Sequence, residues 1–270
     1  MPEGHTLHRL AGELTEAFGG RVVASSSPQG RFDAGAARLD GRVLLEATAR
    51  GKHVLVAFEG LADQVHVHLG LFGGWQLGPG DTAVRGQVRW RLQTEDRVAD
   101  LRGPTACALL GPPEVDALLA RLGPDPLVPG TDPEPAWLRI AGSRTSIAAL
   151  LMDQSVVAGV GNVYRAEVLF RHGVDPTTPG RELSRTTWDA LWDDLVVLMR
   201  EGVRTGRIDT VRPEHEPGAM GRPARRDDHG GEVYVYRRDG RPCLVCGSSV
   251  QKATVAARNL FWCPTCQRGR

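Results

Sequence analysis

Apolar residues recur at two different spacings along the first 110 residues. Over 6–18 they follow helical spacing, at Leu7, Leu10, Leu14 and Phe18. Further along they alternate with polar residues in segments separated by glycines, at Val54, Val56, Val65, Val67, Leu69, Val88, Trp90 and Leu92. The first spacing predicts an amphipathic helix over 6–18 that stops at the glycine pair 19–20. The alternation from 21 to about 110 predicts an antiparallel sandwich or barrel.

Proline and glycine interrupt the chain over 112–133, and helical spacing follows. The interruption predicts a domain boundary. Ser143 can cap a helix that carries Ile147, Leu150 and Leu151, a second helix is predicted to begin near Asn162 after the turn QSVVAGVG, and a third to cover 183–201. Residues 205–232 show no period and many Gly, Pro and charged residues, which predicts a long mobile loop.

The C-terminal segment, opened by EVYVYRRDG, contains two cysteine pairs that predict a hairpin bearing zinc. The four cysteines form two C-x2-C pairs with sixteen residues between them, at Cys243, Cys246, Cys263 and Cys266. This is the spacing of a four-thiolate site, whose closed shell leaves no position for catalysis, so the zinc is expected to be structural. Two disulfides are the alternative, which a cytoplasmic location disfavours. Cys107, in the apolar run ACALL, is expected to be a core residue.

Charge is uneven although the formal net charge is only +1. Residues 236–270 hold seven Arg or Lys and one Asp, a local net of +6, which predicts a phosphate-binding surface or a solvated basic tail. Of the 33 basic residues only Lys52 and Lys252 are lysine. Lysine can exchange a proton when its pKa is lowered, whereas arginine in practice cannot, so Lys52 is a candidate catalytic group.

The N-terminus MPEG offers a second candidate group. Removal of Met1 would leave Pro2 with a free secondary amine, whose pKa of about 7.7–8 leaves part of it nucleophilic at neutral pH. Such an amine forms a cationic iminium with an aldehyde carbon. Glu3 follows directly and would supply a carboxyl for proton transfer. Each of these residues alone is also compatible with an ordinary exposed terminus.

Together these segments resemble the formamidopyrimidine-DNA glycosylase and endonuclease VIII family. The resemblance spans almost the whole chain and rests on MPEG, GKHVLV, HLGLFGGW, LGPDPL, LLMDQSVVAGVGNVYRAEVLF and the pair CLVC and FWCPTCQ, in that order. It implies an α+β multidomain fold, with an N-terminal helix and β-sandwich, a helix-two-turn-helix domain and a C-terminal zinc finger. The expected boundaries are 1–120, 121–232 and 233–270.

The resemblance also implies a chemistry. Pro2 would attack C1′ of a damaged nucleotide, Glu3 would donate a proton, Lys52 would assist base loss and β-elimination, and Arg258 would grip phosphate for δ-elimination. Asn162 would bind a DNA phosphate, and Leu71 and Phe72 would fill the gap left by a flipped base. The opening MPEGHT and the HLGLFGGW segment are closer to the endonuclease VIII branch, which implies oxidised pyrimidines.

Two departures leave alternatives open. The family often has a second Glu near position 6, where this chain has His5-Thr6, and the family's other gap-filling residues have no clear counterpart beyond Arg102. A lyase acting mainly on abasic sites, or a non-catalytic zinc-finger DNA-binding protein, are therefore the alternative functions. The His5/His8 and His66/His68 pairs are expected to be surface or DNA-facing residues rather than a second metal site.

Partners and location follow from the same observations. No stretch approaches the roughly 18 uninterrupted apolar residues of a membrane span, and the N-terminus has no apolar signal core, so a cytoplasmic, nucleoid-associated location is expected. A monomer is expected because the sequence shows no exposed heptad and no long apolar strand edge. Damaged DNA is the expected partner, and structural Zn²⁺ the expected cofactor.

Overall fold

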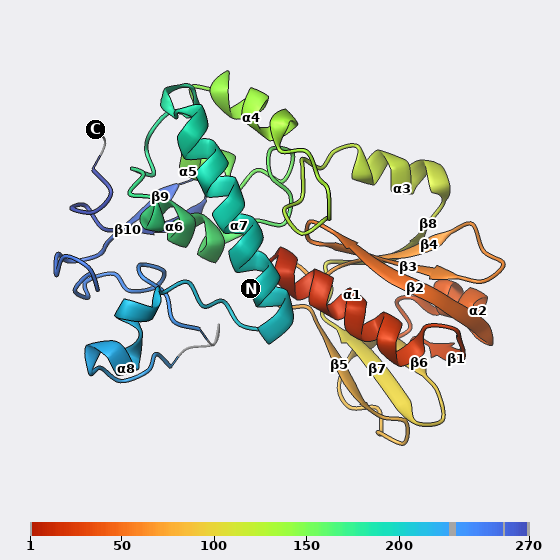
Figure 1. The fold of residues 1–270 in the computed structure, drawn as a ribbon. Helices are drawn as coiled ribbons and strands as arrows, with labels where there is room; N and C mark the ends of the chain where they lie inside the picture. Colours follow the sequence, from red (N-terminus) through yellow and green to blue (C-terminus); the bar gives the residue numbers. More distant parts are fainter. Residues whose placement is uncertain (1, 227–230, 256, 269–270) are drawn as a thin grey trace. The chain divides into compact units, whose positions relative to one another are not determined.

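The computed structural model describes residues 2–226, 231–255 and 257–268 (Figure 1). The chain forms two compact units, Met1–Arg121 and Leu122–Arg270. No helix in the described ranges is both long enough and apolar enough to span a bilayer. The expected further division of the second unit at residue 232 stays a prediction.

The first unit contains an N-terminal helix and eight strands. Helix α1 (Gly4–Phe18) starts two residues before the predicted 6–18 and ends where predicted. The strands are β1 (Arg21–Ser26), β2 (Arg42–Arg50), β3 (His53–Phe58), β4 (Gln64–His68), β5 (Gly74–Pro79), β6 (Val88–Gln93), β7 (Arg97–Arg102) and β8 (Ala106–Leu110). Two shorter helices are α2 (Asp33–Leu39) and α3 (Pro112–Leu119).

The strands pair antiparallel in the order β5-β7-β6-β1-β2-β3-β4-β8. Residues 21–23 of β1 pair with β2, and residues 24–26 pair with β6, so β1 continues from one layer into the other. Figure 1 shows the two resulting layers, with β2, β3, β4 and β8 in one and β5, β6 and β7 in the other. The predicted β-sandwich is confirmed.

The alternating apolar residues face the core of this sandwich. Val54, Val56, Val65, Val67 and Trp90 are completely buried. The apolar face of α1 joins the same cluster, because Leu7, Leu10, Leu14 and Phe18 pack with the strand residues. The alternating residues therefore form the core face of the strands, and the residues at helical spacing form the face of α1 that packs against them.

The second unit is helical and ends in a two-stranded hairpin. Its helices are α4 (Glu134–Ala141), α5 (Ile147–Leu150), α6 (Asn162–Arg171), η1 (Gly180–Glu182), α7 (Arg185–Thr205), η2 (Pro213–His215) and α8 (Pro217–Met220). Strands β9 (Gln251–Val255) and β10 (Arg258–Trp262) form the hairpin. One apolar cluster contains residues of α6, α7 and the hairpin, so the finger and the helices share a core.

In the second unit, helix boundaries differ from the sequence expectation at the start of α5 and at both ends of α7. Ser143 does not cap a helix: its hydroxyl accepts from the Thr145 N–H at 3.1 Å in a turn, and Ser146 holds the cap position of the four-residue α5. Helix α7 covers Arg185–Thr205 rather than 183–201, because Ser184 accepts from the Thr187 N–H at its start.

Two C-terminal segments also differ from the expectation. The stretch 205–232, expected to lack periodic structure, contains η2 and α8, although its mobility stays a prediction. The alternating EVYVYRRDG does not form a strand of the hairpin, because the N–H groups of Tyr234, Val235 and Tyr236 donate to the carboxylate of Glu167 instead of a neighbouring strand.

Candidate functional site

The start of α1 and the turn between β2 and β3 lie at one end of the first unit. Helix α1 runs antiparallel to β2, with its last turn beside the beginning of the strand and Thr15 accepting from the Ala47 N–H at 2.8 Å. Glu3 lies twelve residues before Thr15, about 18 Å along a helix. Lys52 lies five residues after Ala47, about 17 Å along a strand. The two lengths match, so Pro2, Glu3 and Lys52 are carried to the same end.

The helix start combines a proline, a buried carboxyl and a buried imidazole. Pro2 is half-buried, and Glu3 is 0% exposed at the N-cap of α1, with an extended backbone. His5 is also buried, and burial followed by the positive charge of the amino terminus lowers the pKa of His5 to about 4. The imidazole is therefore neutral at pH 7. The expectation that His5 is a surface or DNA-facing residue is therefore wrong, because its side chain is only 5% exposed.

Lys52 occupies a tight turn whose backbone is held from β4. Gly51 precedes it with φ of 57°, a left-handed conformation that favours glycine. The carbonyl of Lys52 lies 2.9 Å from Nδ1 of His68 at the end of β4. Since a carbonyl only accepts, this His68 nitrogen carries the proton. The turn thus presents a half-buried Lys52 from a fixed backbone.

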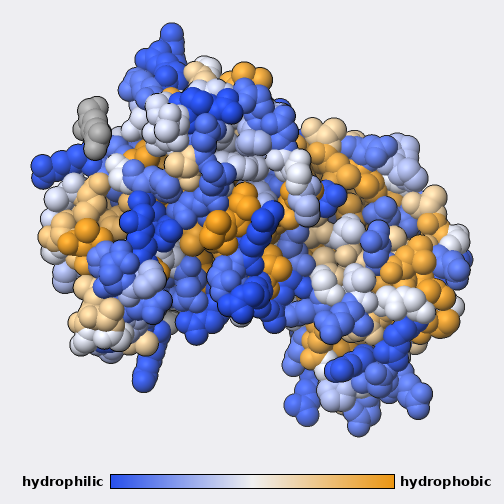
Figure 2. Space-filling view, viewed as in Figure 1, coloured by the Kyte–Doolittle hydropathy of each residue, from blue (hydrophilic) through white to orange (hydrophobic). Residues whose placement is uncertain are grey.

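Leu71 and Phe72 project from the loop between β4 and β5. Phe72 is 92% exposed and Leu71 46%, and among the described residues no other large apolar side chain is as exposed as Phe72. The Gly73 N–H closes the loop on the Leu69 carbonyl at 3.0 Å. Figure 2 shows apolar patches between hydrophilic side chains on the visible face. Because full burial of a Phe side chain contributes about 1.5–3 kcal/mol, an exposed one at a rigid turn is suited to insertion into a partner.

Arg102 does not have the features expected of a gap-filling residue. Its guanidinium donates to Asp100 at 2.8 Å, to Gln76 at 2.8 Å and to the Arg85 carbonyl at 3.1 Å. Asp100 also receives two hydrogen bonds from the buried Arg91. Arg102 therefore stabilises the β5–β7 layer.

Asn162 is the first residue of α6, in a turn that Gln154 organises. The side chain of Gln154 accepts from the Gly159 N–H and donates to the Val160 carbonyl, both at 3.0 Å. Asn162 is 6% exposed, and its Oδ1 accepts a hydrogen bond from Arg165. Because Oδ1 accepts from Arg165, the Asn162 side chain would use its NH₂ group toward a ligand. An NH₂ group donates hydrogen bonds, as binding of an anion requires.

Arg258 is brought near Asn162 through Arg165. Arg258 is exposed at the start of β10, and the carbonyl of the next residue, Asn259, accepts from Arg165 at 3.0 Å. The guanidinium that binds Oδ1 of Asn162 therefore also binds the backbone beside Arg258. Sequence reasoning did not identify Arg165, which is fully buried.

The four predicted zinc ligands converge. Their sulfur atoms all lie within 4.8 Å of one another, with Cys243 and Cys266 3.9 Å apart and Cys246 and Cys263 3.4 Å apart. Four ligands at about 2.3 Å from a tetrahedral zinc would be about 3.8 Å apart. The donor set therefore fits one structural zinc. His66 and His68 are not part of a metal-ligand group among the described residues.

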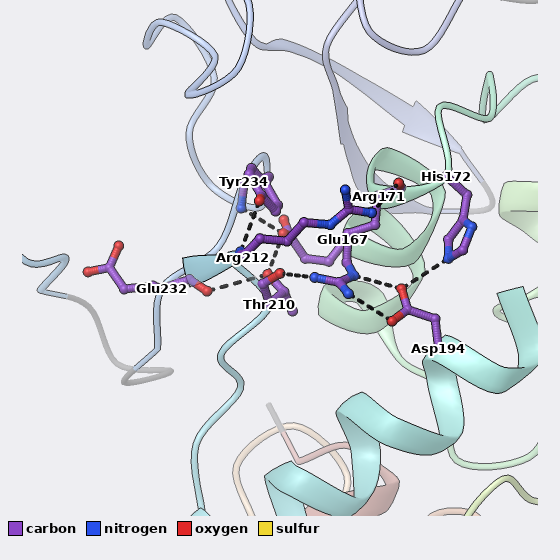
Figure 3. Close-up of polar contacts among 8 residues, drawn as sticks. All are labelled: Glu167, Arg171, His172, Asp194, Thr210, Arg212, Glu232 and Tyr234. Atoms are coloured by element: carbon purple, nitrogen blue, oxygen red, sulfur yellow. Dashed lines mark hydrogen bonds and ion pairs between the residues drawn. The ribbon is translucent and has the colours of Figure 1, made fainter. Parts of the chain in front are cut away.

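A buried polar cluster connects α6, α7 and the segment that leads into the finger (Figure 3). Glu167 is 0% exposed and accepts from the Thr210 hydroxyl at 2.7 Å as well as from three backbone N–H groups. Arg171, the last residue of α6, and His172 directly after it contact Asp194 of α7 at 2.6 and 3.0 Å. Through Glu167, both Thr210 and the backbone of residues 234–236 are bound to α6.

Three family models match the chain in sequence order. The formamidopyrimidine-DNA glycosylase N-terminal domain matches residues 1–107, the H2TH domain of the same enzymes matches 122–213, and the zinc finger found in FPG and IleRS matches 240–269. Together they account for most of the chain.

Named relatives match over nearly their whole length. The chain is 50% identical to "Endonuclease 8 1" of Mycobacterium tuberculosis, covering 99% of this chain and 100% of the relative. It is 31% identical to "Endonuclease 8" of Escherichia coli, covering 99% and 100%. It is 33% identical to a formamidopyrimidine-DNA glycosylase of Stenotrophomonas maltophilia, covering 91% and 85%.

The fold matches that of solved structures. Lactococcus lactis Fpg in complex with DNA containing an abasic site has a TM-score of 0.80 at 22% identity, covering 99% of this chain and 100% of that one. The same Fpg with DNA containing N7-benzyl-Fapy-dG has a TM-score of 0.79 at 22% identity, with the same coverage.

Proposed function

Because the chain belongs to the formamidopyrimidine-DNA glycosylase and endonuclease VIII family, we propose that it is a bifunctional DNA glycosylase and abasic-site lyase of base excision repair. Its substrates are oxidised bases in DNA, with a preference for pyrimidines. The observation that carries the proposal is the presence of Pro2, buried Glu3, Lys52 and the exposed Phe72 on elements of one unit, with Pro2, Glu3 and Lys52 at one end of it.

The reaction begins with the secondary amine of Pro2, which the loss of Met1 would leave at the amino terminus. Its lone pair forms a bond to C1′ of the damaged nucleotide, and the base leaves with the electron pair of the glycosylic bond. Glu3 donates a proton to the ring oxygen O4′ and regains one from the Pro2 nitrogen, so the C1′–O4′ bond breaks and the sugar ring opens to an iminium. Lys52 acts in base departure and in abstraction of the C2′ proton.

Elimination then breaks the strand. The iminium accepts electrons from the C2′–H bond, so the 3′ phosphate leaves by β-elimination, and a second elimination releases the 5′ phosphate. Arg258 and Asn162 hold DNA phosphates through charge-assisted hydrogen bonds, and Leu71 and Phe72 fill the gap left by the flipped base. Water finally hydrolyses the iminium and frees Pro2.

Borohydride trapping tests the proposal. The protein, with the loss of Met1 checked by mass spectrometry, is incubated with duplex DNA containing thymine glycol or an abasic site and then reduced. A covalent adduct on both substrates that disappears in Pro2→Gly is expected. An adduct with abasic DNA alone would favour the lyase alternative, and DNA binding without any adduct would favour a non-catalytic zinc-finger protein.

Base preference needs a separate comparison. We expect faster single-turnover excision of thymine glycol than of 8-oxoguanine, because the 50% identical relative carries the name endonuclease 8. Faster excision of 8-oxoguanine would contradict the pyrimidine assignment and leave the glycosylase activity in place.

We also expect the protein to be a monomer in solution, which sedimentation would test.

A further inference from the structure

Three histidines share the face of β3 and β4 that points away from the sandwich core. The antiparallel register pairs His53 with His68 and Leu55 with His66, so all four side chains lie on one face. The valines between them form the core face. Leu55 packs against Val115 and Leu118 of α3 on the outer side. His53 directly follows Lys52 in the chain.

The three rings are in direct contact. Nδ1 of His53 lies 2.8 Å from Nε2 of His66, a hydrogen bond in which one ring donates and the other accepts. The rings of His53 and His68 are stacked, with centroids 4.8 Å apart at 28°. Nδ1 of His68 donates to the Lys52 carbonyl. A continuous set of contacts thus runs from His66 through His53 and His68 to the backbone of Lys52.

The surroundings keep the His53–His66 pair neutral. Burial, then the charges of His68, His66, Arg121 and Lys52, lowers the pKa of His53 to about 3. Burial, then His68 and Arg121, lowers the pKa of His66 to about 4. Arg50 of β2 pairs with His53 in the register, while β8 offers only Ala106 and Ala108 opposite His68 and His66. No carboxylate is among these groups.

We propose that His53 and His66 are positioning residues that hold the Lys52 turn in its reactive geometry. The inference rests on the proposed function, because base departure and β-elimination are the steps in which Lys52 acts there. Gly51 gives the turn conformational freedom, and two links restrict it. One is the covalent bond from Lys52 to His53, whose ring is hydrogen-bonded to His66 on β4. The other is the hydrogen bond from His68 to the Lys52 carbonyl. Neither His53 nor His66 needs to touch DNA in this role.

Single-turnover kinetics of thymine glycol excision tests the pair. His66→Leu removes the hydrogen bond and puts an apolar side chain in place of the ring. We expect the maximal rate to fall about tenfold, with DNA affinity within about twofold of the wild type. His66→Gln, whose amide can still bond to His53, should recover most of that rate. His53→Phe, which keeps the ring stacking but cannot hydrogen-bond, should behave like His66→Leu. Urea unfolding checks that each variant is folded.

Three results would overturn the proposal: an unchanged rate in His66→Leu, a His66→Gln variant as slow as His66→Leu, or a loss confined to DNA affinity. A further readout is long-range ¹H–¹⁵N NMR of the imidazoles at pH 7. Neutral rings are expected at His53 and His66, and an imidazolium at either position would contradict the proposed neutral, hydrogen-bonded pair. Trapping of wild-type protein by borohydride is measured first. Its failure would reject the proposed function, whereas a trapped wild type with unaffected variants would reject only the positioning role.

Discussion

At the residue scale, buried charged side chains hold the second unit together. Glu167 makes four hydrogen bonds through one carboxylate that is 0% exposed. Hydrogen bonds to charged groups contribute about 1.5–3 kcal/mol each, and leaving a buried donor unsatisfied costs about 1–3 kcal/mol. Such residues dominate local stability.

Glu167→Ala should therefore lower the free energy of unfolding by at least about 3 kcal/mol, because it leaves three backbone N–H groups without their acceptor. Urea unfolding measures the change. Glu182→Ala, an exposed glutamate in the same unit, is the matched control and should change stability by less than about 0.5 kcal/mol. Equal effects of the two substitutions would contradict the anchoring role of Glu167.

Asp194 should make stability depend on pH. Burial alone raises its pKa, but hydrogen bonds from His172 and Arg171 outweigh burial and lower the pKa of Asp194 to about 2. A carboxyl with a lowered pKa stabilises the fold above its unfolded pKa and loses that contribution as the pH falls toward the folded value. Asp194→Asn should thus be less stable than wild type by about 1–2 kcal/mol at pH 7.

The difference between wild type and Asp194→Asn should narrow as the pH falls from about 4 toward 2. Unfolding by urea at a series of pH values measures it. A difference that stays constant down to pH 3 would mean that Asp194 is not held ionised by these partners.

At the element scale, tight turns decide which side chains the sandwich presents. The loop between β4 and β5 exposes Leu71 and Phe72 because Gly73 turns back onto Leu69. A Cβ on Gly73 would lie 2.3 Å from the Leu69 carbonyl oxygen and 3.0 Å from that of Gly103. Both are backbone atoms, which cannot move aside as a side chain can.

Gly73→Ala should therefore distort the loop, lower the free energy of unfolding by about 1–3 kcal/mol and slow base excision at least about tenfold. Gly74→Ala is the control, since a Cβ there meets no atom within 4 Å. Urea unfolding and single-turnover excision measure both variants. Near-wild-type excision by a folded Gly73→Ala would show that the loop geometry is not required.

At the scale of the whole molecule, the chain consists of two units, and the zinc finger belongs to the core of the second. Val250, Leu260 and Phe261 of the finger are buried in the same cluster as residues of α6 and α7. Two hydrogen bonds add polar links: Arg165 donates to the Asn259 carbonyl and Gln267 donates to the Val174 carbonyl, both at 3.0 Å. Loss of the metal should therefore affect more than the finger.

Cys246→Ser should reduce the zinc content, measured by atomic emission, from one ion per chain to substoichiometric levels. It should also weaken DNA binding and lower the stability of the second unit, because folding of such fingers depends on the metal. Cys107→Ser, outside the zinc cluster, should keep one zinc. Unchanged zinc content in Cys246→Ser would contradict the four-cysteine site.

The sequence by itself determined features that depend on local spacing. The α1 helix and the sandwich strands followed from periods of 3.6 and two, which the side-chain geometry of helices and strands imposes. The zinc ligands followed from two C-x2-C pairs, because a short knuckle can direct two sulfurs at one ion. Pro2, Glu3 and Lys52 were candidates from their own chemistry, whereas Asn162, Arg258 and the Leu71–Phe72 pair followed from the resemblance to a family. The roles of all these residues stay predictions.

Only the tertiary structure decided which distant residues meet. The EVYVYRRDG segment alternates like a strand, yet Glu167, 67 to 69 residues away, takes its N–H groups. Arg165 joins Asn162 to the backbone beside Arg258, and the His53–His66 pair depends on the register of β3 and β4. These contacts are set by packing between segments far apart in the chain, which leaves no periodic or spacing signal within any one of them.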